Sequence, residues 1–173
     1  MEMTRRYASP LGELWLAANE NGLKCVHFAR PGEAFAQAGD VDGCAGDILA
    51  QTERWLDGYF AGKAPVGLPP LAAQGTDFQR EVWELLLQIP YGCVTSYGAL
   101  AAELGRRRGG RMAAQAVGGA VGRNPIAILV PCHRVVGTDG SLTGYAGGMD
   151  KKAALLALER ADCTQLCAPW GAI

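Results

Sequence analysis

Histidine is scarce in this chain of 173 residues, which holds only two, His27 and His133. No apolar run approaches the ~18 residues that a membrane-spanning helix needs. The opening residues, 1–6, lack the apolar core of a secretory signal peptide. Hydrophobic residues make up 49% and charged residues 19% of the chain, which is typical of a globular fold of one large or two small domains. We therefore expect a cytoplasmic protein with no membrane partner.

The six cysteines are few and scattered, without the regular spacing of a disulfide framework. Cys163 and Cys167 are separated by three residues, but no second pair of ligands accompanies them, so we expect no zinc site. The cysteine pattern is typical of a reducing compartment. We expect neither a metal nor any other cofactor.

Charge is nearly balanced, because the formal net charge is −1. This value argues against a protein that covers nucleic acid nonspecifically through a large positive charge. The two halves differ, however: residues 1–77 hold six basic and ten acidic side chains, whereas residues 78–173 hold ten and seven. Cys132 lies in the slightly basic half.

The first part of the chain has the pattern of a small α/β domain, residues 1–74. Its expected elements are strands at 14–18 and 23–28 joined by a turn at 19–22, a surface connection at 30–46, a helix at 48–60 and a linker at 63–74. Cys25 and His27 could share a strand face, and we interpret them as ordinary sheet positions. This domain shows no evident chemistry in the sequence.

The second part, residues 75–173, begins with a capping box formed by Thr76 and Gln79, followed by an amphipathic helix that ends near Pro90. A short helix at 96–104, a turn at 105–111 with four arginines and a helix at 112–122 have the outline of a helix-turn-helix. Gly118 and Gly119 in the last of these helices indicate either close packing against another helix or close approach to a nucleic-acid backbone.

An apolar run at 126–130 predicts a buried strand that ends at Pro131. The end of this strand would hold Cys132 and His133 close together. A neighbouring imidazole favours the reactive thiolate form of cysteine. The alternative is a structural cysteine beside a histidine that caps a backbone group. Adjacent strand residues point to opposite faces, so contact between the two side chains requires a turn at the dipeptide or a bridging water.

The last predicted helix, residues 151–161 with Asp150 as its N-cap, places Glu159 between Leu155 and Leu156 on the helical wheel. A carboxylate on this core-facing stripe is costly to bury unless it is paired. His133 is the candidate partner. The alternative is a frayed helix end that lets Glu159 reach water.

Together these segments resemble the O6-alkylguanine-DNA alkyltransferases, the methylated-DNA–protein-cysteine methyltransferases, over almost the whole chain. The resemblance rests on Ser9-Pro10-Leu11-Gly12, Gly75-Thr76-x-Phe78-Gln79-x-x-Val82-Trp83, Ile89-Pro90-x-Gly92, Ser96-Tyr97-Gly98-x-Leu100-Ala101, Ala116-Val117-Gly118, Arg123-Asn124-Pro125, Pro131-Cys132-His133-Arg134-Val135 and Leu155-Leu156-x-x-Glu159. Inactive relatives usually carry tryptophan where this chain has Cys132, so the resemblance implies an active protein.

The resemblance implies a ribonuclease-H-like α/β domain followed by a mainly α domain with a helix-turn-helix. It also implies a monomer that binds the minor groove of double-stranded DNA, flips out O6-alkylguanine, or O4-alkylthymine, and transfers the alkyl group irreversibly to Cys132. A thioether is stable, so each molecule reacts once.

The resemblance further implies roles for individual residues. Cys132 is the nucleophile, His133 its base through a water, Glu159 the group that orients His133, Tyr97 the donor to the departing guanine, and Asn124 the brace of the turn before Cys132. Pocket positions are Pro131, Val135, Tyr145, Ala146 and Gly147. Positions for DNA contact are Thr95, Ser96, Arg111, Gln115, Ala116, Gly118, Gly119 and Arg123.

Gln115 departs from the arginine that much of the family uses to fill the gap left by the flipped base, and Arg111 is the other candidate for that task. Two other functions compete with alkyl transfer. A cysteine hydrolase would use Cys132, His133 and Glu159 and turn over repeatedly. A DNA-binding regulator would use Cys132 as a redox sensor.

Overall fold

The computed structural model describes residues 1–37 and 43–170. The chain divides into two compact units, Met1–Gln74 with Pro125–Ala127, and Gly75–Asn124 with Ile128–Ile173. The short segment Pro125–Ala127 thus belongs to the first unit, although the sequence pattern groups it with its neighbours. Backbone hydrogen bonds explain this, because Val26 N donates to Pro125 O at 2.9 Å and Ala127 N donates to Val26 O at 2.8 Å.

The first unit contains a three-stranded antiparallel sheet in the order β1-β2-β3. Its strands are β1 (Met3–Ser9), β2 (Gly12–Asn19) and β3 (Gly22–Phe28). The predicted hairpin of β2 and β3 is confirmed, with Leu14 opposite Phe28. Strand β1 was not predicted, because its sequence carries two arginines and only a weak apolar alternation, as an edge strand can.

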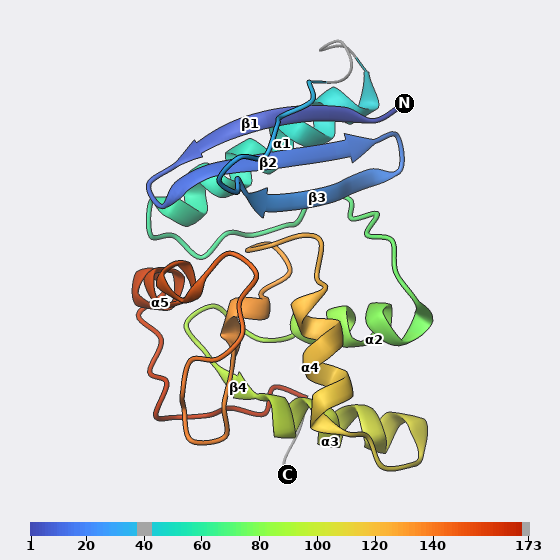
Figure 1. Cartoon of the computed structure of the whole chain (residues 1–173), viewed down its shortest axis with the longest axis vertical. Helices are drawn as coiled ribbons and strands as arrows, with labels where there is room; N and C mark the ends of the chain where they lie inside the picture. The colour runs from blue at the N-terminus through green and yellow to red at the C-terminus, as the bar shows by residue number, and fades with distance from the viewer. Residues whose placement is uncertain (38–42, 171–173) are drawn as a thin grey trace. The chain divides into compact units, whose positions relative to one another are not determined.

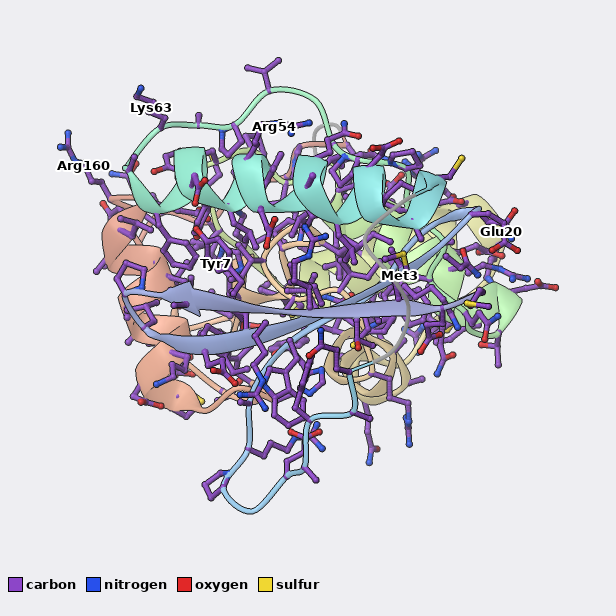
Figure 2. All side chains as sticks on the ribbon, turned by 90° about the horizontal axis from the view of Figure 1, so that it is seen from above. Met3, Tyr7, Glu20, Arg54, Lys63 and Arg160 are labelled. Atoms are coloured by element: carbon purple, nitrogen blue, oxygen red, sulfur yellow. The ribbon has the colours of Figure 1, made fainter. Side chains whose placement is uncertain are left out.

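Helix α1 (Cys44–Phe60) lies along one face of this sheet (Figure 2). Alternate residues of β2 and β3 point toward it, as the two-residue period of a strand requires. The buried set of both layers is Leu14, Leu16, Ala18, Val26, Phe28, Ile48, Leu49, Leu56 and Tyr59. Tyr7 of β1 donates a hydrogen bond of 2.6 Å from its hydroxyl to Asp57 of α1.

Two sequence-based boundaries in this unit change. Helix α1 begins at Cys44, so residues 44–46 are helical and not part of the predicted surface connection. Residues 38–42 of that connection lie outside the described residues. The end of the predicted linker pairs with the sheet edge, because Leu23 N donates to Pro70 O at 2.7 Å and Ala72 N donates to Leu23 O at 2.8 Å.

The second unit begins with α2 (Asp77–Leu86). The predicted capping box is confirmed: Gln79 N donates to Thr76 Oγ1 at 3.1 Å, and Thr76 N donates to Gln79 Oε1 at 3.0 Å. Helices α3 (Tyr97–Arg108) and α4 (Ala114–Gly122) form the helix-turn-helix pair, and α4 lies beside α3 (Figure 1). Trp83 of α2 fastens α4 by donating from Nε1 to Ala120 O at 2.9 Å.

The predicted basic turn at 105–111 is wrong in its first part, because α3 continues to Arg108. Glu103 lies three and four residues before Arg106 and Arg107, a spacing that favours helix. Gly109 then ends α3 with a left-handed φ of 73°, a conformation that suits glycine. Helix α4 starts at Ala114, two residues later than predicted.

The remaining elements of the second unit are a short parallel pair, β4 (Thr95–Ser96) and β5 (Val135–Val136), a 3₁₀ turn η1 (Cys132–Arg134), and α5 (Met149–Leu158). The N-cap of α5 is Gly148 and not Asp150. Asp150 lies in the first helical turn, where a carboxylate still interacts favourably with the helix dipole. Among the described residues, no helix is long and apolar enough to cross a membrane.

Candidate active site

The predicted strand at 126–130 is wrong. Ile126 forms only an isolated bridge with Val26, and Ile128 has a φ of 72°, which interrupts an extended chain. A β-branched residue adopts this left-handed conformation only where its surroundings impose it. Ile128 is fully buried, so the apolar run reflects a buried irregular segment instead of a strand.

Cys132, His133 and Arg134 form a single 3₁₀ turn. Pro131 precedes it, and Arg134 N donates to Pro131 O at 3.0 Å. The chain therefore turns at the Cys-His dipeptide, one of the two arrangements that contact between these neighbours requires. Both side chains are buried; His133 is fully inaccessible and Cys132 is 8% exposed.

Glu159 lies at the end of α5 and is the centre of a buried polar network. His133 Nε2 lies 2.7 Å from Glu159 Oε1, so the expected partnership is present. Arg134 donates to both carboxylate oxygens, from Nε to Oε2 and from Nη2 to Oε1, each at 2.9 Å. Gly92 N adds a bond of 3.1 Å to Oε2. The alternative of a frayed helix end is excluded, because Glu159 is only 3% exposed.

This network sets the charges of its members. Burial opposes ionisation of Glu159, but the hydrogen bonds from His133 and Arg134 outweigh burial and lower the pKa of Glu159 to about 2. Burial lowers the pKa of His133, although Glu159 acts in the opposite direction. Glu159 is therefore an anion at neutral pH and His133 is a neutral imidazole that can accept a proton.

The thiol of Cys132 is surrounded by groups that counteract its burial. Burial raises the pKa of Cys132, whereas a hydrogen bond with the Asn124 side chain and the charge of Lys152 lower it. Asn124 also donates from Nδ2 to Val130 O at 2.8 Å, which ties the end of α4 to the segment before Cys132. This contact agrees with the bracing role that the resemblance implies for Asn124.

Lys152 of α5 is a buried cation near Cys132 that sequence reasoning missed. Its side chain is fully buried, and Nζ donates to Val135 O at 2.6 Å and Thr143 O at 2.8 Å. Burial lowers the pKa of Lys152 to about 8, while the nearby Cys132 acts to raise it. The available signal was its position three and four residues before Leu155 and Leu156 of the core stripe, because this spacing places Lys152 on the buried side of α5.

Two tyrosines flank the thiol. Burial and the proximity of Cys132 raise the pKa of both Tyr97 and Tyr145. Tyr97 OH donates to Thr143 O at 3.0 Å. The Tyr145 hydroxyl is shielded from solvent and has no hydrogen-bond partner within the part of the chain that the structure describes. A buried hydroxyl of this kind is suited to a polar group of a bound molecule.

The other predicted pocket positions divide by exposure. Pro131 and Val135 are buried next to the turn, Gly147 is half-buried and Ala146 is exposed. Gly118 of α4 lies next to Tyr97, because a Cβ there would be 3.7 Å from Tyr97 Cδ1. This favours the close-packing interpretation for Gly118. A Cβ on Gly119 would lie 3.4 Å from Arg123 Nη1.

The start of α4 presents an exposed face with Arg111, Gln115 and Ala116, and Arg123 is exposed at its end. Thr95 and Ser96 were also expected to contact DNA, but they are not exposed. Thr95 is fully buried in β4, and Ser96 is 4% exposed and caps α3 by accepting from Ala99 N at 3.0 Å. Their place in the structure is therefore in the interior, not on the surface that DNA could touch.

Three of the four arginines in residues 105–111 are engaged with carboxylates. Arg106 and Arg107 bind Glu103 at 2.7 and 2.6 Å, and Arg108 binds Glu81 at 2.9 Å. Within the described ranges Arg111 forms no ion pair, so it is the arginine of this group whose charge is available.

Comparison with known proteins agrees with this geometry. Two family models match the chain: 6-O-methylguanine DNA methyltransferase, ribonuclease-like domain, at residues 4–68, and 6-O-methylguanine DNA methyltransferase, DNA binding domain, at residues 77–161. The methylated-DNA–protein-cysteine methyltransferase of Methanosarcina acetivorans is 44% identical over 153 residues, covering 88% of this chain and 95% of that protein. The protein of that name from Salmonella typhimurium is 42% identical over 171 residues, covering 89% and 93%.

Solved structures of the same family are also similar to this chain. The crystal structure of Mycobacterium tuberculosis OGT in complex with DNA has a TM-score of 0.78 and 41% identity, covering 91% of this chain and 92% of that chain. The two-domain fold predicted from the sequence is confirmed, with a small sheet domain and a helical DNA-binding domain. The chain belongs to the 6-O-methylguanine DNA methyltransferase family.

Proposed function

We propose that this protein repairs alkylated DNA by transferring the alkyl group of O6-alkylguanine, or of O4-alkylthymine, irreversibly to Cys132. The observation that carries the proposal is a buried thiol, 8% exposed, on the same turn as a neutral His133 that is held by an ionised Glu159. These residues belong to the unit that contains the helix-turn-helix. We assign DNA binding and alkyl acceptance to residues 75–173 and a structural role to residues 1–74.

Activation of the thiol starts from the neutral state of His133. The imidazole accepts the Cys132 proton through a bridging water, and Glu159 stabilises the imidazolium that results. Lys152 stabilises the thiolate, since its charge acts against the effect of burial on the pKa of Cys132. Asn124 contributes to the same end by its hydrogen bond with the thiol.

The displacement itself forms one bond and breaks one. The sulfur of Cys132 attacks the alkyl carbon, the carbon–oxygen bond to the base breaks, and its electron pair remains with the base. Tyr97 donates a proton to the departing guanine, which makes guanine a better leaving group. The product is a thioether, so the protein is consumed with each lesion.

DNA is the partner that the helix-turn-helix and the family support. In our proposal α4 approaches the minor groove, and its small residues Ala116 and Gly119 allow a close approach to the backbone. The target base is flipped out of the stack so that Cys132 can reach it. Gln115 fills the gap that the base leaves, Arg111 and Arg123 contact phosphates, and the protein acts as a monomer.

The two competing functions receive less support. A cysteine hydrolase usually draws its Cys and His from distant parts of the chain, whereas Cys132 and His133 are adjacent. A redox sensor requires an accessible thiolate, whereas Cys132 is buried and burial raises its pKa. Neither alternative uses Tyr97 or the buried hydroxyl of Tyr145.

The decisive experiment is incubation with a DNA duplex that contains one O6-methylguanine, followed by intact-protein and peptide mass spectrometry. We expect a mass increase of one methylene per molecule, located on Cys132, and no turnover beyond one equivalent of DNA. Cys132→Ser serves as the control that abolishes transfer. Repeated turnover would support the hydrolase, and a methyl group from DNA on any other cysteine would contradict the assignment of Cys132.

A further inference from the structure

The chain has two histidines, and each is bonded to a glutamate: His133 to Glu159, and His27, which also contacts a cysteine, to Glu33. The second arrangement is in the first unit. Cys25 Sγ lies 3.2 Å from His27 Nδ1, and His27 Nε2 lies 3.2 Å from Glu33 Oε1. The three groups thus form a chain of hydrogen bonds from thiol to imidazole to carboxylate.

Strand β3 produces this arrangement through its two-residue period. Val26 and Phe28 are buried on the side of α1, so Cys25 and His27 point to the opposite face of the sheet. Glu33 reaches them from the loop that follows β3, and this loop lies on the side of the sheet away from α1 (Figure 2). Glu33 Oε2 also accepts from Arg30 N at 3.1 Å, which fixes the carboxylate.

The hydrogen bonds define which ring nitrogen of His27 carries the proton. The bond to Arg30 N lowers the pKa of Glu33, so its carboxylate is ionised and accepts from Nε2–H. In the neutral tautomer that donates from Nε2, Nδ1 carries the lone pair, and it faces the Cys25 thiol. Burial, together with Glu2 and Glu33, raises the pKa of Cys25, so Cys25 rests as a protonated thiol beside Nδ1 of His27.

A cavity of about 250 Å³ opens onto this thiol. Its walls include the aromatic rings of Trp15 and Phe35, whose centroids are 5.2 Å apart. The loop that carries Phe35 is tied to the sheet, because Thr4 Oγ1 donates to Ala36 O at 2.7 Å and Arg6 stacks over the Phe35 ring. Glu2 is an acidic side chain that lines the cavity, and Glu33 lies behind it against His27 Nε2.

We propose that Cys25 is a second nucleophilic thiol, which reacts directly with small, uncharged alkylating electrophiles without DNA. His27 is the general base and Glu33 is a positioning residue that acts through His27. The aromatic and aliphatic walls suit an apolar electrophile. Glu2 and Glu33 act on the Cys25 thiol more strongly than the opposing cations Arg30 and Lys24, so the site disfavours anions. The reaction is separate from repair at Cys132, where the alkyl donor is DNA.

The step balances without a cofactor. With iodoacetamide as the electrophile, the Cys25 sulfur forms a bond to the methylene carbon and the carbon–iodine bond breaks. The electron pair of that bond leaves with iodide, and the thiol proton passes to His27 Nδ1 and then to solvent. The raised pKa of the thiol is consistent with this order, because the proton is removed during the attack and not before it.

The experiment measures iodoacetamide labelling of each cysteine in the whole chain, by fragmentation mass spectrometry, in the absence of DNA. Cys44 is exposed and serves as the reference in the same molecule. We expect His27→Phe, which keeps a ring against Trp15, to lower the ratio of Cys25 to Cys44 labelling rates at least about tenfold, since general bases contribute about 10²–10⁴-fold. Glu33→Gln should lower the same ratio less.

Iodoacetate provides the matched anionic probe. We expect the labelling rate of Cys25 to fall more than that of Cys44 when iodoacetate replaces iodoacetamide. An unchanged ratio in a folded His27→Phe protein, or equal discrimination against iodoacetate at both cysteines, overturns the proposal. If His27→Phe does not fold, as judged by urea unfolding, His27→Gln takes its place with the same expected loss and the same contrary outcome.

Discussion

Arg134 holds Glu159 with two parallel hydrogen bonds of 2.9 Å each, and both side chains are nearly inaccessible to solvent. A third bond, from Arg134 Nη1 to Ile89 O at 2.7 Å, anchors the guanidinium to the end of the α2 region. The pair leaves His133 Nε2 facing a carboxylate that cannot rotate away. Arg134 thus fixes the orientation of the proposed base although it does not touch the proposed substrate.

Loss of Arg134 should destabilise the protein strongly. Arg134→Ala leaves Glu159 buried with an unbalanced charge, and breaking one partner of a buried pair costs about 3–5 kcal/mol. Arg134→Lys should cost less, because it keeps the charge but not the two parallel bonds. Urea unfolding measures both, and a loss under about 1 kcal/mol for Arg134→Ala would contradict a buried network.

Acid should weaken the fold through Glu159. Its pKa in the folded protein is about 2, below the ordinary value of 4.5, so its stabilising contribution is complete above pH 4.5. The contribution is lost as the pH falls from 4.5 toward 2 and amounts to about 3 kcal/mol. Unfolding free energies measured across this range should fall more steeply for the parent than for Glu159→Gln, and parallel slopes would contradict the depressed pKa.

Glu159→Gln should also slow alkyl transfer before it affects DNA affinity. The amide cannot stabilise an imidazolium at His133, whereas the DNA-contacting face of α4 is unchanged. Single-turnover alkylation and equilibrium binding to an unreactive duplex separate the two effects. Equal losses in rate and in affinity would indicate a structural role for Glu159 instead of an orienting one.

Gln115 and Arg111 should have different functions on DNA. Gln115→Ala should reduce the alkylation rate on duplex DNA with a smaller loss of affinity, because refilling the stack offsets part of the cost of base flipping. Arg111→Ala should weaken binding and reduce the slope of log affinity against log salt by about 0.9, the value for one phosphate contact. If Gln115→Ala reacts at the parent rate and Arg111→Ala does not, Arg111 fills the gap.

Arg107 offers a matched control for Arg111. Because Arg107 is bound to Glu103 at 2.6 Å, Arg107→Ala should change the salt dependence of DNA binding less than Arg111→Ala does. A larger effect at Arg107 would mean that the ion pair opens on DNA.

Lys152 should accelerate alkyl transfer through the pKa of Cys132. Lys152→Met keeps the length of the side chain but removes the charge, so the pKa of the thiol should rise and the rate near pH 7 should fall about tenfold for each unit. The deficit should shrink as the pH increases. Lys151→Met is the control, and a pH-independent loss at Lys152 would indicate damage to the fold instead.

Local sequence patterns were enough to predict some parts of this structure. The capping box of Thr76 and Gln79, the hairpin of β2 and β3 and the burial of Glu159 beside Leu155 and Leu156 depend on residues close together in the chain. Their geometry follows from the periods of helix and strand, so the sequence predicts them. The same reasoning could have lengthened α3, since Glu103 is spaced to bind Arg106 and Arg107.

The apolar run before Cys132 shows where local patterns fail. Burial is correct for Ile126 and residues 128–130, but a strand needs a partner along its length, and only Ile126 finds one. The left-handed φ of Ile128 depends on its surroundings and not on its own preference. Sequence therefore determined that this segment is buried, and tertiary packing determined its shape.

The proposed site divides in the same way. The sequence alone pointed to Cys132, His133 and Glu159 through the Cys-His dipeptide and a helical wheel, and Tyr97 followed only from the family resemblance. Only the tertiary structure brought Arg134 to Ile89, Lys152 to Val135 and Asn124 to the thiol, and only it placed Glu33 against His27. Charge interactions of this kind act through space and within a few ångströms, so residues far apart in the chain must be folded together before their pKa values and partners are decided.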